Sequence, residues 1–268
     1  MGRFTARLLQ AVRQWDKPSQ VALALALALL VVMLLVAAFG PPGLRQPALI
    51  GAGGLLIITQ LIILWGNRGM VTPYTKAQRA YLDEDFETAR QLLEGVRASG
   101  KADFRELTLL GNTYRQLGEV NLSEEVLTEA LRLQPNHHFS LYGFGRTLLV
   151  QGKYTEAADA ISRALAAGAP SVVQVDLGEA YYRQGLWDEA RAALEEVTSL
   201  VEAAHRRLMA DYLLYRLDHG EPPSEALIEA GLPYWRAEVE RFRLTPYGRA
   251  LADDVRRLQT LGGGPADV

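Results

Sequence analysis

The sequence offers few side chains that could carry out catalysis or hold a metal ion. Cysteine is absent and there are only four histidines, which excludes disulfides, thiolate metal sites and a cysteine nucleophile. His137 and His138 are adjacent, whereas two histidines that bind one metal from a helix are spaced four residues apart. Gly143 and Gly145 lack the third glycine and the preceding strand of a dinucleotide-binding loop. We therefore expect no catalytic residue, no metal, no cofactor and no small-molecule substrate, and the chain is not predicted to be an enzyme.

Charge and hydropathy divide the chain into two unlike parts. Residues 1–68 carry six Lys/Arg and one acid, a net charge of +5, whereas residues 69–268 carry a net charge of −8. Binding of nucleic acid needs clustered basic residues, so the acidic larger part argues against nucleic acid as a partner. The sequence therefore predicts a basic, apolar N-terminal segment followed by an acidic, water-soluble part.

Two apolar runs near the N-terminus are long enough to cross a bilayer. Residues 21–39 and 48–65 contain nineteen and eighteen residues without a charge, and helices of this length match a hydrocarbon core of about 30 Å. Residues 40–47 contain three prolines and two glycines, which predicts a tight, non-helical connection. A transmembrane hairpin is therefore expected over residues 20–68. A cleaved signal sequence is the alternative, but the first run is longer than such signals need and a second run follows.

Basic residues around these runs predict the orientation of the hairpin. Four Lys/Arg precede the first run and three follow the second within residues 68–79, whereas the connection has only Arg45. Loops rich in Lys/Arg stay in the cytoplasm. We therefore expect both ends of the chain, and the part after the hairpin, on the cytoplasmic side of an inner (cytoplasmic) membrane. The Ala/Leu/Arg-rich composition is typical of a bacterial protein.

Residues 1–19 and the second run carry further signals of membrane contact. Apolar residues of the first segment recur on one helical face, which predicts an interfacial helix contacting lipid, with an ordinary polar flank as the alternative. Gly51, Gly53 and Gly54 would let another helix approach closely, and packing within the hairpin is the favoured explanation of these glycines over contact with a membrane partner. The Gln60 amide finds no polar side chain in residues 21–39, so it favours contact with another membrane protein.

A repeat of about 34 residues organises the remainder of the chain. Two glycine columns recur at spacings of 34 and 33 residues. They consist of Gly111, Gly145 and Gly178, and of Gly118, Gly152 and Gly185. Each unit predicts two antiparallel helices, because glycine suits the turn within a unit and proline ends the second helix.

The motif Leu110-Gly111-x-x-Tyr114, followed by Ser123, Leu127, Ala130 and Pro135, resembles the tetratricopeptide repeat (TPR) family. The resemblance extends over about residues 70–203. It implies an all-α fold in which the transmembrane hairpin is followed by a TPR-like α-solenoid over residues 69–203. A degenerate repeat and capping helices are expected over residues 204–261, and a disordered tail over residues 262–268.

The C-terminal region departs from the repeat pattern. Residues 202–217 are predicted to be helical, and Ser224 is an expected N-cap for a short helix over residues 225–230. Further helices are expected around residues 233–242 and up to residue 261. Whether the first two of these form a fifth repeat stays open. The terminal helices are expected to cap the open end of the solenoid.

The resemblance also implies a protein-binding groove, because the first helices of successive TPR units line a concave surface. Arg and Tyr concentrate binding energy, and a basic groove suits a partner with carboxylate groups. Ordinary surface residues are the alternative explanation. The predicted groove residues are Arg105, Asn112, Arg115, Phe139, Tyr142, Arg146, Glu179, Tyr182 and Arg183.

These features together predict a membrane-anchored TPR adaptor or scaffold that binds a protein partner through a cytoplasmic groove. The alternative is an accessory or assembly subunit of a larger integral membrane complex, which docks through its spans as well as its repeats. In that case Gly51, Gly53, Gly54 and Gln60 would form the membrane partner contact.

Overall fold

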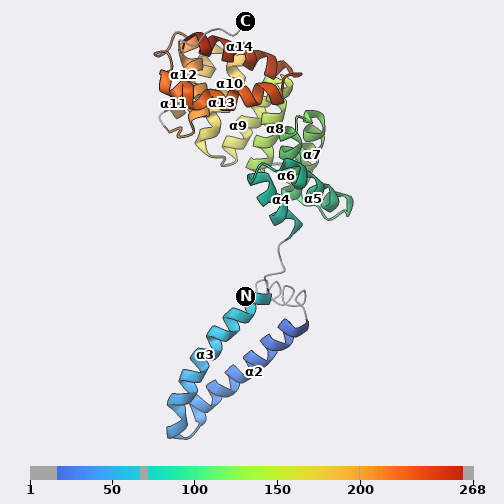
Figure 1. Ribbon diagram of the computed structural model, residues 1–268, viewed down its shortest axis with the longest axis vertical. Helices are drawn as coiled ribbons and strands as arrows, with labels where there is room; N and C mark the ends of the chain where they lie inside the picture. Colours follow the sequence, from blue (N-terminus) through green and yellow to red (C-terminus); the bar gives the residue numbers. More distant parts are fainter. Residues whose placement is uncertain (1–16, 67–71, 199, 262–268) are drawn as a thin grey trace. The chain divides into compact units, whose positions relative to one another are not determined.

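The computed structural model describes residues 17–66, 72–198 and 200–261 (Figure 1). Regular structure in these residues is helical throughout. The chain divides into two compact units, Met1–Thr72 and Pro73–Val268. Most of the predicted interfacial helix and the predicted disordered tail at 262–268 lie outside the described residues.

The first unit is an antiparallel pair of apolar helices, α2 (Lys17–Phe39) and α3 (Pro42–Gly66). Both are long and apolar enough to cross a membrane by length and composition. Small residues, among them Ala26, Ala48 and Ala52, are buried where the two helices meet. Most large apolar side chains of the pair are instead exposed.

The connection between α2 and α3 is shorter than predicted. The expected non-helical segment over residues 40–47 is wrong, because α3 begins at Pro42. Proline is tolerated at the first helical position, since an N–H there would have no intrahelical acceptor. Arg45 donates from Nε to the Gly40 carbonyl at 3.0 Å and stabilises the turn.

In its described residues, the second unit contains five antiparallel helix pairs and a final helix. Within each pair the first helix packs along the second, as the repeat pattern predicts. The pairs are α4 (Pro73–Leu82) and α5 (Phe86–Ala98), α6 (Phe104–Gln116) and α7 (Val120–Leu133), α8 (His138–Gln151) and α9 (Tyr154–Ala166), α10 (Gln174–Gln184) and α11 (Trp187–Thr198), and α12 (Ala204–Arg216) and α13 (Glu225–Arg241). The short 3₁₀ turn Ser171–Val173 precedes α10, and α14 (Pro246–Leu261) ends the unit.

The first glycine column lies where the two helices of a pair come closest. A Cβ added at Gly111 would stand 2.5 Å from Cγ of Leu127, and one at Gly178 would stand 2.6 Å from Cγ of Leu194. Any larger residue would push the paired helices apart. The repeat of glycine therefore reflects one close contact that recurs in successive pairs.

Helix α13 differs from the sequence expectation because it continues through Pro233. The prediction of separate helices at 225–230 and 233–242 is wrong. The Ser224 hydroxyl accepts a hydrogen bond from the Leu227 N–H at 3.3 Å, so the N-cap is confirmed. Ile228, Leu232 and Trp235 are all buried, and this continuous apolar face compensates for the backbone hydrogen bond that proline removes.

The end of α13 and the whole of α14 fold back onto the array rather than extending it. Helix α14 contacts α8 as well as α13. Arg241, at the end of α13, donates to the Gln116 side chain of α6 at 2.7 Å, across 125 sequence positions. The C-terminal helices therefore cover part of the inner surface formed by the first helices of the pairs, in addition to ending the solenoid.

The close contact between the first turn of α14 and the end of α13 can be tested by substituting Gly248, with Gly95 of α5 as the comparison. A Cβ at Gly248 would stand 2.0 Å from the Phe242 carbonyl oxygen, whereas one at Gly95 within α5 has nothing within 4 Å. Gly248→Ala should lower the melting temperature, because backbone atoms must move to admit the methyl group. Gly95→Ala should raise stability by roughly 0.5–1 kcal/mol, since alanine favours a helix interior. Thermal unfolding followed by circular dichroism compares the two, and equal shifts would contradict the turn geometry.

Candidate functional site

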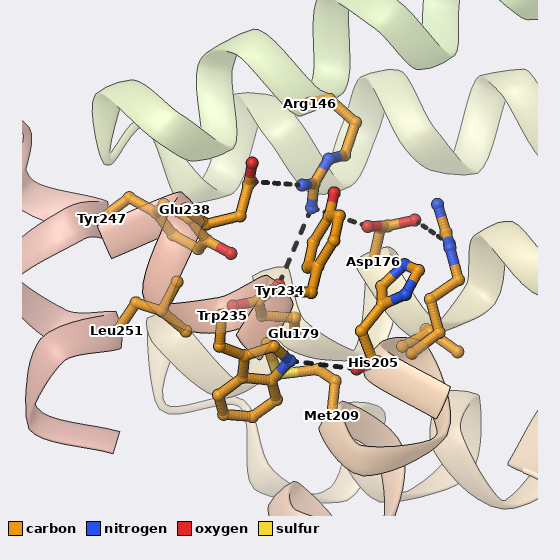
Figure 2. Close-up of a pocket in the computed structure, with 12 residues that line it drawn as sticks. Arg146, Asp176, Glu179, His205, Met209, Tyr234, Trp235, Glu238, Tyr247 and Leu251 are labelled. Carbon is orange, nitrogen blue, oxygen red and sulfur yellow. Dashed lines mark hydrogen bonds and ion pairs between the residues drawn. The ribbon is translucent and has the colours of Figure 1, made fainter. Parts of the chain in front are cut away.

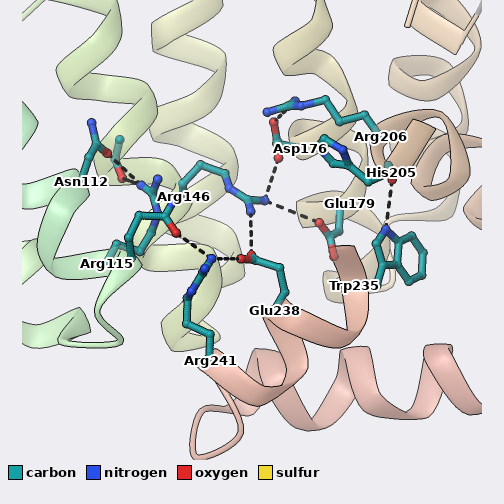
Figure 3. A network of polar contacts seen from close by, with 12 residues as sticks. Asn112, Arg115, Arg146, Asp176, Glu179, His205, Arg206, Trp235, Glu238 and Arg241 are labelled. Atoms are coloured by element: carbon teal, nitrogen blue, oxygen red, sulfur yellow. Dashed lines mark hydrogen bonds and ion pairs between the residues drawn. The ribbon is translucent and has the colours of Figure 1, made fainter. Parts of the chain in front are cut away.

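The inner surface of the repeat array is divided into a covered part and an open part. The covered part contains a network of charged side chains from α8, α10 and α12 that meets Glu238 of α13 (Figure 3). The same network also meets Asp254 of α14. The open part lies over α4, α6 and the beginning of α8. The two parts have different chemistry because only the first has the C-terminal helices above it.

Arg146 of α8 is the centre of the covered network (Figure 3). Its guanidinium lies 2.7 Å from the carboxylate of Asp176 and 3.9 Å from that of Glu179, both on α10. It also lies 3.7 Å from the Glu238 carboxylate on α13. One arginine therefore links three helices through acids that are themselves buried.

A second arginine completes the pairing of Asp176. Arg206 of α12 lies 2.7 Å from this carboxylate and donates to the Tyr142 hydroxyl at 2.6 Å. The same hydroxyl donates to Asp176 at 2.8 Å. Burial opposes ionisation of Asp176, but the charges of Arg206 and Arg146 outweigh it and hold the pKa of this carboxyl below its usual range.

Arg183 of α10 makes the corresponding link to α14. It lies 3.1 Å from the Glu179 carboxylate and 2.6 Å from that of Asp254. Tyr212 of α12 donates its hydroxyl to Asp254 at 2.9 Å. Burial raises the pKa of Glu179 even though Arg183 and Arg146 favour its ionised form. The C-terminal helices are thus held on the array by carboxylates as well as by apolar packing.

A small pocket remains between this network and α13 (Figure 2). His205 stacks on Tyr234 with ring centroids 3.9 Å apart, and its backbone carbonyl accepts the indole N–H of Trp235 at 3.0 Å. Burial and the nearby Arg206 lower the pKa of His205, which favours its neutral form. Among residues 17–66, 72–198 and 200–261, no three His, Asp or Glu side chains are grouped so that they could hold a metal ion.

The open part of the inner surface is a groove with a volume of about 280 Å³, close to the lower end of the usual range for binding pockets. We call it the open groove. Phe139 at its edge is 57 % exposed, although it is a large aromatic side chain. The lining residues are Tyr74, Gln78, Tyr81, Leu82, Arg105, Thr108, Leu109, Asn112, His137 and Phe139.

Two arginines of α6 lie at this part of the inner surface without an acidic partner. Arg115 donates to the Asn112 side chain at 2.9 Å and to the Gly143 carbonyl at 3.3 Å. Arg105 stacks over the Phe104 ring at 5.5 Å. In the part of the chain that the structure describes, neither guanidinium has a carboxylate within ion-pair distance.

The structure separates the nine residues that the sequence placed in one groove. Arg105, Asn112 and Phe139 line the open groove, and Arg115 contacts Asn112. Tyr182 packs against Trp187 with ring centroids 5.3 Å apart. The remaining four belong to the covered network, since α13 and α14 lie over them. These four are Tyr142, Arg146, Glu179 and Arg183.

Sequence reasoning missed the contribution of α4 to the open groove. The first repeat matches the family motif weakly, so no residue of α4 was predicted to line it. The 34-residue spacing nevertheless extends to α4, because Ala77 lies 34 residues before Gly111. This places Gln78 in the position of Asn112, and both side chains line the open groove.

The residues predicted to contact a membrane partner lie on different sides of α3. Gly51 faces the first helix, because a Cβ there would lie 3.5 Å from the Met33 sulfur. Gly53 and Gly54 are exposed and have open space beside them. Gln60 is exposed as well. Packing within the hairpin therefore accounts for Gly51 and leaves the other three on the outer surface.

Comparison with known families agrees with the helix pairs. The family model described as "Tetratricopeptide repeat" matches residues 108–172 and 142–207. This part of the chain is therefore similar to TPRs. The matched residues run from α6 into α12 and so include most of the inner surface that forms the network. No curated protein sequence matches the chain.

Several solved structures are similar to the TPR array. "Crystal structure of MamA" is 20 % identical, covers 62 % of this chain and 93 % of its own, and has a TM-score of 0.46. "MamA 41-end from Desulfovibrio magneticus RS-1" is 19 % identical over 70 % and 92 % of the two chains, with a TM-score of 0.48. A thermophilic TPR protein of Thermus thermophilus is 16 % identical over 70 % and 97 %, with a TM-score of 0.49.

Proposed function

We propose that this chain is a membrane-anchored TPR scaffold that binds a protein partner through the open groove. The observation that carries the proposal is this groove, which has an exposed aromatic edge at Phe139 and, in the part of the chain that the structure describes, an Arg105 without a carboxylate in ion-pair distance. Buried aromatic and arginine side chains dominate the binding energy of protein interfaces. The scaffold acts by binding alone, without catalysis, cofactor, nucleic acid or small-molecule substrate.

The apolar surface of α2 and α3 supports the membrane anchor. Large side chains such as Leu25, Leu35 and Ile57 are half exposed or more in the hairpin. A surface of this kind along two whole helices is unfavourable in water and favourable in lipid. The distribution of Lys/Arg favours a cytoplasmic location for the TPR array, at an inner membrane. Tethering raises the concentration of the bound partner near the bilayer.

Site-specific cross-linking from the open groove tests this function. A photoreactive amino acid in place of Phe139 should form a cross-link to a protein partner in intact membranes. The same residue in place of Leu133 of α7 is the matched control, because Leu133 is equally exposed at 56 % but does not line the groove. Cross-links from both positions, or from neither, would contradict binding through the groove.

A second function is favoured by the outer surface of α3. The chain would be an accessory or assembly subunit of an integral membrane complex, docked through its spans as well as its repeats. Gly53 and Gln60 are seven residues apart, so they lie on one helical face, and both are exposed. An amide in a lipid-facing segment gains from a hydrogen bond to a neighbouring helix.

Purification in a mild detergent distinguishes the two functions. Loss of a co-purifying membrane complex after Gln60→Leu, with cross-linking from Phe139 unchanged, would favour the accessory subunit. Ile58→Ala, an exposed apolar change on a different face of the same helix, is the control and should leave the complex intact. An unchanged complex in the Gln60 variant would exclude this contact.

A further inference from the structure

The protein's own helices show which chemistry its inner surface accepts. Helix α14 contributes Tyr247, Leu251, Asp254 and Leu258, all of which are buried. These residues lie at positions i, i+4, i+7 and i+11, which share one helical face. The single carboxylate on this apolar face lies 2.6 Å from Arg183 of α10. The array therefore binds a helix through apolar contacts and one ion pair.

Helix α13 also combines buried apolar side chains with one ion pair, and its arginine partner lies on α8, the first helix of the preceding pair. Glu238 follows buried Trp235 on α13, and its carboxylate lies 3.7 Å from Arg146 of α8. Arginines on the first helices of two successive pairs are thus each paired with an acid from a helix lying over them. In both cases the acid is only 4 % exposed, so the ion pair is shielded from water.

The open groove continues this surface beyond the point where the C-terminal helices end. Arg241 closes the junction, because it bonds both Glu238 of α13 and Gln116 of α6 (Figure 3). Arg115 lies next to this junction and Arg105 lies at the other end of α6, and neither has a carboxylate in ion-pair distance among the described residues. The apolar contacts are also present, since Leu109 and Phe139 line the groove.

We propose that the open groove binds an amphipathic helix of a partner protein, whose apolar face carries one Asp or Glu that pairs with Arg105 or Arg115. The partner helix lies on α4, α6 and α8 as α14 lies on α8 and α10. This inference rests on the proposed function and names the partner's chemistry. An extended peptide is the other possible occupant, and the experiment separates the two.

A peptide selection against the whole chain tests the inference. The detergent-solubilised full-length protein is used to select from a displayed library of random 16-residue peptides, with the Phe139→Ala protein for counter-selection. We expect enriched peptides to lack internal proline and to have apolar residues at i, i+4 and i+11 with Asp or Glu nearby. Enrichment of proline-containing or acid-free peptides, or no enrichment over the counter-selection, would overturn the proposal.

A charge exchange then tests the ion pair directly. Arg105→Glu and Arg115→Glu are measured separately, and at least one should weaken binding of an enriched peptide roughly tenfold, as expected for a close charge pair. Replacing the peptide's acid by arginine should restore binding to that variant, which also shows that the variant is folded. Arg132→Glu, an exposed change on α7, is the control. Equal loss in the control, or failure of the exchange with both variants, would overturn the pairing.

Failure of the helical-partner proposal can be distinguished from failure of the proposed scaffold function. Cross-links from Phe139 combined with enrichment of extended or acid-free peptides would leave the scaffold function standing and reject the helical partner. Absence of cross-links from Phe139 would reject both.

Discussion

Replacing Trp235 by alanine should reduce the free energy of unfolding by about 3–5 kcal/mol, the usual cost of removing a buried aromatic side chain. Trp235 is only 2 % exposed and belongs to the core that joins α8–α12 with α13 and α14. Its ring packs edge-on against Tyr212 at 5.9 Å, and its N–H bonds the His205 carbonyl. The substitution removes these apolar contacts together with the hydrogen bond from the indole N–H to the His205 carbonyl.

Trp187 provides the matched control for this substitution. Its side chain is 52 % exposed at the start of α11, so Trp187→Ala should cost less than about 1 kcal/mol. Chemical denaturation of the detergent-solubilised protein, followed by far-ultraviolet circular dichroism, compares the variants. Similar losses for the two tryptophans would show that α13 is not part of the cooperative core.

Replacing Arg183 by methionine should be destabilising by about 3–5 kcal/mol, because it leaves the buried Asp254 carboxylate without its cation and Glu179 with only the more distant Arg146. Glu179 and Asp254 both lie within ion-pair distance of this guanidinium, and its side chain is only 8 % exposed. The melting temperature of the variant should therefore fall by roughly 10 °C. Differential scanning fluorimetry in detergent measures the change.

Two further variants separate the ion pair from simple packing. Arg163→Met removes an exposed arginine that lies 3.5 Å from Asp159 on the same helix, and it should change stability by less than about 0.5 kcal/mol. Adding Glu179→Gln and Asp254→Asn to Arg183→Met removes the stranded charges and should recover most of the loss. A triple variant as unstable as Arg183→Met would show that the charges are not its cause.

The local periodicity of the sequence was sufficient to predict the helix pairs. Gly111, Gly145 and Gly178 share one phase because each lies at the same contact between paired helices. Such contacts join residues about 16 positions apart, as between Gly111 and Leu127, and they leave a regular pattern in every unit. The all-helical TPR array was therefore predictable, and the family match confirms the repeat.

The position of α13 and α14 could not be predicted in the same way. Arg241 meets Gln116 across 125 positions, and no repeat encodes a contact that occurs once. Glu238 and Asp254 look like acids on a solvated helix face when only the sequence is considered, yet they are the partners of Arg146 and Arg183. The sequence therefore predicts that these arginines line an accessible groove, because it does not reveal that α13 and α14 cover them.

The packing of α14 against α8 affects which parts of the array are expected to move. Buried residues from 148 to 258 form one core, whereas those from 77 to 130 form a second, smaller core. In an ordinary repeat array each repeat contacts only its neighbours. Here the long-range contacts join α8–α14 through one continuous core. We therefore expect larger motions in α4–α7, whose core is smaller and whose link to the C-terminal helices is the hydrogen bond from Arg241 to Gln116. A partner helix lying across the open groove would restrict these motions.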